Sequence, residues 1–347
     1  MTTRRPPLRF GVAYDFRNPP GFDGLRNPEL YAEVLEQAAF ADALGFDQIW
    51  LTEHHFVEDG YLPSFVAVAG AIAARTKRAR ISTDIALLPF HDALRLAEDM
   101  AVLDNLSNGR MELGVGMGYA RHEFEAFGVP RAQRVSRTVE AVQVLRQAWS
   151  DAPVRFRGKR YAIENVAVHP KPVQAGGIPL WMAAQSEGGA RRAAELGLNL
   201  LPQGTRSATI DTWSDALRAR GDAPERYRVG IIRSFLASDD PERDWALVKP
   251  SEVYRMQLYT QWAESSGDDV AGFASPDRIP QRWIVGTSEQ VHDELARFIA
   301  EYGLTDVVTW GAPPGLAPSR LNASLEKFAR EVMPRLRARF AADEETP

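Results

Sequence analysis

Short apolar runs alternate with longer amphipathic stretches along most of the chain. Eight runs have the length and the apolar composition of buried strands; they cover residues 9–14, 46–51, 80–87, 110–115, 179–183, 198–201, 228–236 and 305–310. Between them, apolar residues recur at the helical period of about 3.6 residues, as Leu30, Val34, Ala38 and Ala41 do within residues 28–44. The same period predicts helices over residues 94–106, 134–149, 188–196, 209–220 and 288–302.

Strands that alternate with helices predict an α/β fold, because parallel strands need a crossover connection that a helix supplies. Eight strands favour a closed TIM (β/α)8 barrel over an open sheet, and the 347 residues fit one such domain over residues 1–347. Residues 1–7 and 341–347 are expected to be flexible tails.

Two stretches interrupt the alternation. Residues 153–172, centred on Gly158, predict a hairpin inserted between strands four and five. Residues 239–282 are richer in Trp, Pro, Ser and Asp, and they predict a helix and a mobile loop inserted between strands seven and eight. Whether that second insertion closes over a site as a lid stays open at this point.

Composition narrows the class of protein. The chain has no cysteine, which excludes disulfides, thiolate nucleophiles and iron–sulfur ligation. No signal peptide and no run of about 20 apolar residues is present, so we expect a cytoplasmic protein with no membrane partner. The net charge of −5, with no basic block, argues against nucleic acid and favours a small-molecule substrate.

An acid and two adjacent histidines, Glu53, His54 and His55, follow the second apolar run. In a barrel, the carboxyl ends of the strands carry the catalytic side chains. Because successive residues of a strand point to opposite faces, we expect one histidine to enter the mouth and the other to be structural. A histidine beside Glu53 could act as a general base, and a satisfied polar pair of Glu53 with His54 is the competing interpretation.

The other histidines do not suggest a metal site. His91, His122, His169 and His292 are scattered singly, and the chain has no H-E-x-x-H sequence. We therefore expect no metal ligand set, and a metal-dependent barrel hydrolase stays as a disfavoured alternative.

Glycines recur at every second position of the fourth apolar run, at Gly114, Gly116 and Gly118. Such spacing removes side chains from one face and lets a flat ligand approach the backbone. The spacing differs from the G-x-G-x-x-G of dinucleotide-binding folds, and no acid ends a second strand about 20 residues later. Close packing of a strand against its neighbours explains the glycines nearly as well.

A small polar turn, Gln185 to Gly189, follows the fifth apolar run and leads into a helix. The amino end of a helix presents unpaired backbone N–H groups and a positive dipole end, which suit a phosphate. Ser186 would add a hydroxyl donor. An ordinary helix cap at Ser186 fits the same residues.

Together these motifs resemble the bacterial luciferase-like flavin-dependent monooxygenases. The resemblance rests on Glu53-His54-His55-Phe56, the glycine-rich run ending in Tyr119, the segment Glu123-Phe124-Glu125-Ala126-Phe127-Gly128 and the turn Gln185-Ser186-Glu187-Gly188-Gly189. It implies a TIM barrel that binds FMN across its carboxyl-terminal mouth, usually as a homodimer. It also implies that a separate NAD(P)H-dependent flavin reductase supplies reduced FMN.

The resemblance carries roles to individual residues. His54 matches the histidine that luciferases use as a base near the flavin, and Glu53 matches its preceding acid. Asp84 and Ile85 fall where luciferases have a non-prolyl cis peptide bond beneath the flavin ring. The residues implied for cofactor binding are Asp84, Ile85, Ala86, Gly116, Tyr119, Gln185, Ser186, Gly188 and Gly189. The residues expected in the substrate pocket are His55, Phe56, Phe90 and Trp310.

One departure concerns the phosphate site. Luciferases have a cysteine and then an arginine where this chain has Gly116 and Met117. Loss of the arginine removes a fixed charge from that site, which suits an enzyme that borrows its flavin.

The function implied by the resemblance is oxygenation of a small, largely apolar organic substrate. Reduced FMN would react with O2 as co-substrate to a flavin hydroperoxide, which the pocket must protect from water. One alternative is a deazaflavin-dependent oxidoreductase that transfers a hydride on the same fold. Another is a non-catalytic flavin-binding barrel. The sequence does not name the substrate.

Overall fold

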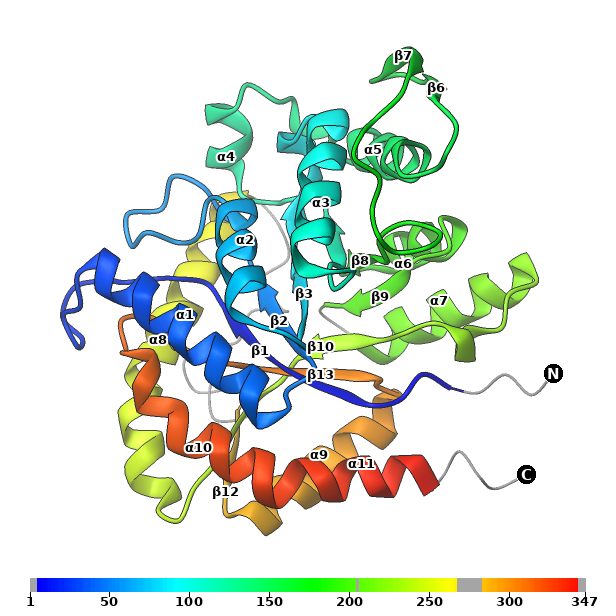
Figure 1. Ribbon diagram of the computed structural model, residues 1–347. Coiled ribbons are helices and arrows are strands. Elements are labelled where there is room, and N and C mark those ends of the chain that lie inside the picture. The colour runs from blue at the N-terminus through cyan, green and yellow to red at the C-terminus, as the bar shows by residue number, and fades with distance from the viewer. Residues whose placement is uncertain (1–4, 204–205, 267–282, 343–347) are drawn as a thin grey trace.

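The computed structural model describes residues 5–203, 206–266 and 283–342. Parallel strands lie at the centre, and helices surround them (Figure 1). The strands are β1 (Arg9–Tyr14), β2 (Gln48–Leu51), β3 (Arg80–Thr83), β4 (Ala86–Leu87), β5 (Leu113–Gly116), β6 (Val154–Arg157), β7 (Ala162–Val166), β8 (Leu180–Ala184), β9 (Asn199–Pro202), β10 (Gly230–Ile232), β11 (Ser234–Ala237), β12 (Trp283–Gly286) and β13 (Asp306–Trp310).

The α-helices follow the strands in sequence and pack outside them. They are α1 (Asn27–Leu44), α2 (Phe65–Arg75), α3 (Ala93–Ser107), α4 (Arg121–Ala126), α5 (Arg134–Ala148), α6 (Glu187–Glu195), α7 (Arg206–Arg220), α8 (Pro241–Ser266), α9 (Ser288–Tyr302), α10 (Asn322–Lys327) and α11 (Met333–Ala342). None of the described helices is both long and apolar enough to cross a membrane.

The parallel strands form two larger sheets, in the orders β10-β13-β1-β2-β3 and β4-β5-β8-β9. Isolated bridges join these sheets twice, between Ile81 and Met111 and between Leu200 and Val229. Neighbouring strands can therefore be followed from β1 through β5 and β9 to β13, which pairs with β1 again. The mixed α/β architecture with parallel pairing, predicted from the alternation of runs, is confirmed.

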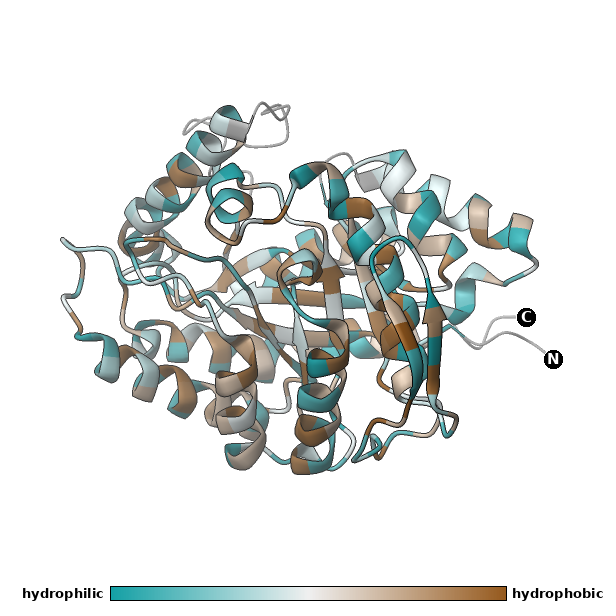
Figure 2. Ribbon diagram, turned by 90° about the horizontal axis from the view of Figure 1, so that it is seen from above, coloured by the Kyte–Doolittle hydropathy of each residue, from teal (hydrophilic) through white to brown (hydrophobic). Residues whose placement is uncertain are grey.

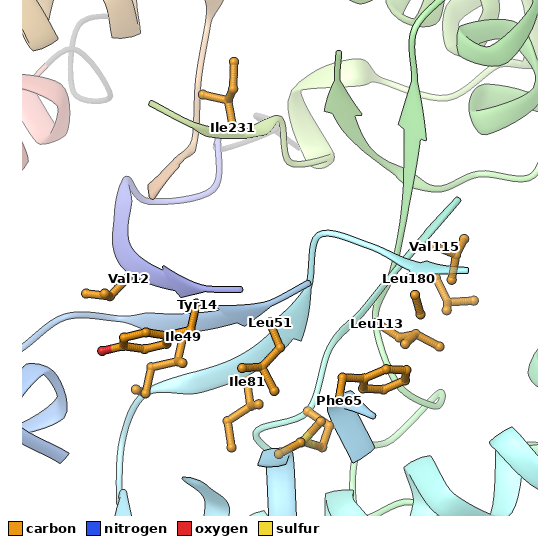
Figure 3. Packing of buried hydrophobic residues seen from close by; sticks show 14 of the residues in the cluster. Val12, Tyr14, Ile49, Leu51, Phe65, Ile81, Leu113, Val115, Leu180 and Ile231 are labelled. Atoms are coloured by element: carbon orange, nitrogen blue, oxygen red, sulfur yellow. The ribbon is translucent and has the colours of Figure 1, made fainter. Parts of the chain in front are cut away.

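The core explains why the strands appear as continuous apolar runs. Every residue of β1 and of β2 is buried, as expected for parallel strands that are covered on both faces. Side chains from several strands meet in one cluster, including Val12, Ile49, Ile81, Leu113 and Leu180 (Figure 3). Figure 2 shows hydrophobic strands at the centre and more hydrophilic residues on the outer parts of the helices.

Two of the predicted strands are divided in the structure. Residues 80–87 form β3, which pairs with β2, and β4, which pairs with β5; Asp84 and Ile85 lie between them. Residues 228–236 form β10, which pairs with β13, and β11, which pairs with β12. The sequence analysis missed β12, because its four residues Trp283–Gly286 are too short to give a period.

Helix α2 was also missed. Its sequence, Phe65–Arg75, is apolar nearly throughout, so that neither the strand period nor the helix period stands out. The strong helix preference of its alanines and its burial against α3 decide the structure.

The two predicted insertions are partly described. Strands β6 and β7, which lie between β5 and β8 in the sequence, form an antiparallel hairpin. Figure 1 places this hairpin away from the central strands. Helix α8 occupies residues 241–266 of the second insertion, and its predicted loop lies outside the described residues. Of the predicted tails, residues 1–4 and 343–347 also lie outside the described residues, and Arg5 donates a hydrogen bond to the Leu304 carbonyl at 3.3 Å.

Candidate active site

His54 lies just beyond the carboxyl end of β2 and is paired with a buried carboxylate. Its Nδ1 atom is 2.9 Å from Oε1 of Glu123 on α4, and the side chain of Glu123 is fully buried. The same oxygen accepts a hydrogen bond from the backbone N–H of His55 at 2.8 Å. Because a carboxylate accepts but does not donate, Nδ1 carries the hydrogen, and Nε2 of the neutral ring is the atom able to take a proton.

Aromatic rings enclose His54. Its ring centroid lies 4.8 Å from that of Tyr61, 5.6 Å from Tyr119 and 4.9 Å from Trp262. Tyr259, 6.4 Å away, contacts Tyr61 through hydroxyl oxygens that are 3.0 Å apart. Trp262 and Tyr259 belong to α8, so this helix supplies part of the wall around the histidine. His54 itself is only 7% exposed, so its imidazole ring is largely shielded from water.

The predicted pairing of Glu53 with His54 is wrong. Glu53 instead lies 2.8 Å from Nε2 of His91 and 3.2 Å from Nε2 of His55, and it accepts a hydrogen bond from the Leu87 backbone. Burial by itself raises the pKa of Glu53, but the charge of His91 and these hydrogen bonds lower it to about 2. The adjacent histidines point to opposite sides, as the alternation of side chains predicts. His54 contacts Glu123, whereas His55 contacts Glu53.

The residues expected in the substrate pocket do not all meet. His55 and Phe90 line a cavity of about 150 Å³ together with Phe127. Phe56 is 62% exposed and packs its ring against Phe127 at 5.1 Å. Trp310 lies in a different cluster, where the guanidinium carbon of Arg255 is 3.8 Å from its ring centroid. Neither Phe56 nor Trp310 lines the cavity beside His55 and Phe90.

A buried group of charges lies where β1 ends and α8 crosses. Arg17 is 1% exposed, and its Nε is 2.7 Å from Oδ2 of Asp59. Arg255 on α8 lies 3.2 Å from Asp15 and 3.3 Å from Glu252. These residues were not singled out from the sequence. Their only local signal in the sequence is that Asp15 and Arg17 directly follow an apolar run; Arg255 lies far along the chain, within a helix.

The residues predicted to surround the flavin ring lie at the ends of β3 and β5. The peptide bond between Asp84 and Ile85 is cis, as the resemblance implied. Asp84 is half-buried, and desolvation raises the pKa of its carboxyl to about 7. A Cβ at Gly116 would lie 1.8 Å from the Ile85 side chain, and one at Gly114 would lie 2.0 Å from the Thr83 carbonyl oxygen. The space at these two glycines is thus taken by the Ile85 side chain and the Thr83 backbone, which favours the alternative of close packing over an open face.

The turn from Gln185 to Gly189 suits a phosphate. Ser186 caps α6, since its Oγ accepts from the Gly189 N–H at 3.3 Å, and a Cβ at Gly188 would meet no atom within 4 Å. The arginine that luciferases carry at the position of Met117 has a substitute from another element. A guanidinium nitrogen of Arg192 on α6 lies 3.9 Å from the Met117 sulfur, so a cation is present beside this turn.

Two further features lie away from this site. Within the described residues, Glu289, His292 and Asp293 are the one group close enough to share a metal ion. Arg335 forms an ion pair with Glu289 at 2.8 Å, so a metal ion would have to compete with this guanidinium for the carboxylate. A cavity of about 380 Å³ lies at the opposite end of the strands, beside Arg9 and Glu112.

Comparison with known proteins identifies the family. A sequence model of the luciferase-like monooxygenases matches residues 8–306. The chain is 26% identical to an F420-dependent glucose-6-phosphate dehydrogenase of Amycolatopsis mediterranei, over 88% of this chain and 95% of that protein. It is 24% identical to the oxygenase component of a flavin-dependent trigonelline monooxygenase of Acinetobacter baylyi, over 88% of this chain and 90% of that protein.

A solved structure shares the fold. The monooxygenase RslO1 of Streptomyces bottropensis superposes with a TM-score of 0.80 and 25% identity, over 94% of this chain and 99% of that one. The chain therefore belongs to the luciferase-like monooxygenase family and is an oxidoreductase. Its relatives use flavin in some cases and F420 in others.

Proposed function

We propose that this chain is a flavin-dependent monooxygenase that uses reduced FMN and O2 to oxygenate a small, largely apolar organic substrate. The single observation that carries the proposal is the buried pair of His54 with Glu123, 2.9 Å apart and enclosed by aromatic rings. A histidine whose tautomer is fixed by a carboxylate is equipped to move a proton in a site that excludes water.

The residues present fit a flavin. The turn Gln185 to Gly189 would hold its phosphate at the amino end of α6, with Arg192 close by. Asp84, Ile85, Ala86, Gly116 and Tyr119 would lie along its ring. When bound, reduced flavin supplies the electrons that activate oxygen. The chain itself contributes His54 to hold or accept a proton at Nε2, and the rings of Tyr61 and Trp262 to keep water away.

The proposal extends to the assembly of the enzyme. The fold is a closed (β/α)8 barrel forming one domain, with the β6–β7 hairpin after the fourth barrel strand and α8 after the seventh. The chain works as a cytoplasmic homodimer, and a separate NAD(P)H-dependent reductase supplies its reduced FMN. The name of the trigonelline relative, an oxygenase component, supports such a division between two proteins.

A deazaflavin-dependent hydride transfer is the second candidate. It is favoured by the likeness to an F420-dependent dehydrogenase over 88% of this chain. The same His54 would then take the proton of an alcohol substrate. A non-catalytic flavin-binding barrel is disfavoured by the buried pair of His54 with Glu123, since such a protein has no use for a positioned base.

An anaerobic titration decides between the cofactors. The purified protein is titrated with reduced FMN and, separately, with F420 in its oxidised form, which accepts the hydride of an alcohol, and in its reduced form; binding is followed by absorbance. Oxygen is then added, and its consumption is compared with the release of hydrogen peroxide for a panel of substrates. Binding of reduced FMN with oxygen consumption coupled to product supports the monooxygenase. Binding of F420 alone, with turnover in the absence of oxygen, replaces it with the hydride transfer.

Two variants test the roles of the buried pair. His54→Ala should abolish product while leaving the affinity for reduced flavin unchanged, and unchanged turnover would remove His54 from the mechanism. Glu123→Gln keeps a hydrogen-bond acceptor near Nδ1 but removes the charge, so turnover should fall by about 100-fold. Glu125→Gln, two residues along α4 and with an exposed side chain, serves as the matched control.

A further inference from the structure

Arg17 carries two hydrogen-bond donors that the described residues do not satisfy. The residue is 1% exposed, and only its Nε is used, by Asp59 at 2.7 Å. Its terminal nitrogens Nη1 and Nη2 have no hydrogen-bond partner within the described part of the chain. Buried polar groups are normally paired, and an unpaired buried cation is costly. The position therefore suits a ligand that supplies the missing acceptors.

The surroundings of Arg17 connect it to the proposed site. Its guanidinium carbon lies 5.2 Å from the ring centroid of Tyr61, 5.6 Å from that of Tyr259 and 5.9 Å from that of Trp262. These three rings also surround His54. A group bound to Arg17 would thus lie against the same aromatic rings that surround the histidine base.

The shape of the unfilled donor pair indicates which acceptor fits. Nη1 and Nη2 form one side of a planar fork, and two parallel N–H groups on that side match the two oxygens of a carboxylate. A lone hydroxyl or a water molecule would have to share one oxygen between the two N–H groups, whereas a carboxylate gives each its own charged acceptor. Asp59 occupies Nε and leaves this side of the fork unused.

A second buried arginine belongs to the same group of charges. Arg255 is paired with Asp15 and Glu252, although its geometry to both leaves its nitrogens without regular hydrogen bonds. Burial raises the pKa of Asp15, and the charges of Arg255 and Arg17 oppose that rise. The positive charge of Arg255 close by adds to the attraction of this region for an anion.

We propose that Arg17 is the substrate-binding residue for a carboxylate, so that the substrates of this enzyme are organic acids with a planar, apolar body. The inference rests on the proposed function, because it identifies the substrate class of the same site. It assigns Nη1 and Nη2 to the two carboxylate oxygens, and the rings of Tyr61, Tyr259 and Trp262 to the apolar body.

The test uses two probes that differ only in charge. Benzoate and its neutral isostere benzamide are each titrated into the full-length protein without flavin, and heat is recorded by calorimetry. Benzoate should bind saturably, and the affinity for benzamide should be lower by about tenfold or more. Equal binding of the two probes, or no saturable binding of benzoate, overturns the proposal.

A variant of Arg17 assigns the binding to the residue. Arg17→Lys keeps a cation for Asp59 but loses the two-pronged side of the fork, so the affinity for benzoate should fall by about tenfold while that for benzamide stays unchanged. Arg218→Lys on α7, whose side chain is exposed, is the matched control and should bind as the unaltered protein does. Unchanged benzoate affinity in a folded Arg17→Lys protein contradicts the assignment. If this variant fails to fold, the comparison of the two probes on the unaltered protein still decides.

Failure of the proposed function would look different. The calorimetry contains no flavin, so a protein that binds no reduced FMN but binds benzoate through Arg17 keeps the carboxylate site and loses only the monooxygenase. A protein that binds reduced FMN but neither probe keeps the proposed function and loses the carboxylate site.

Discussion

At the scale of single residues, two buried carboxylates divide the neighbouring histidines between them. Glu123 contacts Nδ1 of His54, which is surrounded by aromatic rings, whereas Glu53 contacts His91 and His55. The first pair leaves a nitrogen able to take a proton. In the second, Nε2 of His91 lies 2.8 Å from Glu53. Burial lowers the pKa of His91, but the charge and the hydrogen bond of Glu53 outweigh that effect and raise it.

The ion pair of Glu53 with His91 gives stability a defined pH window. The lowered pKa of Glu53 contributes stability that is present above its ordinary pKa of 4.5 and is lost as the pH falls toward about 2. The raised pKa of His91 contributes stability that is present below its ordinary value of 6.5 and is lost as the pH rises through the raised value. Glu53→Gln should therefore lower the free energy of unfolding most between pH 4.5 and 6.5, by about 3 kcal/mol.

Urea unfolding at a series of pH values measures this difference. The deficit of Glu53→Gln should shrink on both the acid and the alkaline side of the window. Glu125→Gln, which breaks only an exposed pair with Arg121, should show a small deficit at every pH. A Glu53→Gln deficit that is independent of pH would mean that packing, not the ion pair, determines the contribution of this residue.

The carboxyl of Asp84 should change the pH dependence of stability in the opposite direction to that of Glu53. Desolvation raises its pKa to about 7, so the unfolded chain ionises near the ordinary value of 3.8 while the folded protein stays protonated. Stability is then lost as the pH rises from 3.8 to about 7 and changes no further above it. Asp84→Asn removes this loss, and its melting temperature relative to the unaltered protein should rise across that range.

Circular dichroism melts at several pH values test the prediction for Asp84. Asp215→Asn, at an exposed position on α7, is the control and should show no such rise. A displacement of the Asp84→Asn melting temperature that is the same at pH 4.5 and pH 8 would contradict the raised pKa, about 7, of this carboxyl.

At the scale of elements, the strands were the most predictable part of the fold. Their positions follow from the fact that parallel strands buried on both faces give unbroken apolar runs. The cis peptide bond between Asp84 and Ile85 followed only from the family resemblance, and the division of that run into β3 and β4 was not predicted, because hydrophobicity alone marks neither. The pairing of His54 with Glu123 spans 69 positions along the chain, so no local spacing could reveal it.

The glycines of β5 offer a test of strand packing. A Cβ at Gly114 would lie 2.0 Å from the Thr83 carbonyl oxygen, which is backbone and cannot turn away, whereas one at Gly116 would meet the end of the Ile85 side chain. Gly114→Ala should therefore lower the free energy of unfolding by about 3 kcal/mol and Gly116→Ala by about 1 kcal/mol. Chemical denaturation measures both, and a larger loss at Gly116 would contradict the stated contacts.

At the scale of the whole molecule, the two ends of the strands have separate tasks. At the amino ends, Arg9 bridges Asp306 at 2.6 Å and Glu112 at 2.8 Å, so charges contributed by three strands or their flanks are neutralised within the molecule. At the carboxyl ends, the buried charges around Arg17 keep unfilled donors. Paired charges at the amino ends and unfilled donors at the carboxyl ends agree with stability residing at the amino ends and ligand binding at the carboxyl ends.

The outer surface bears on the proposed dimer. Val102 and Leu106 lie one turn apart on α3 and are 43% and 63% exposed, so this helix presents two large apolar side chains to solvent. If the homodimer packs through α3, sedimentation should give a mass near twice 38.6 kDa, and Leu106→Glu should shift it toward the monomer. Val166→Glu, at a 37% exposed position on the β6–β7 hairpin, should leave the dimer intact. A charge at either position is exposed in the monomer, so neither variant should disturb the fold. Loss of the dimer in both variants would contradict an interface through α3. A monomeric mass for the unaltered protein would contradict the proposed homodimer.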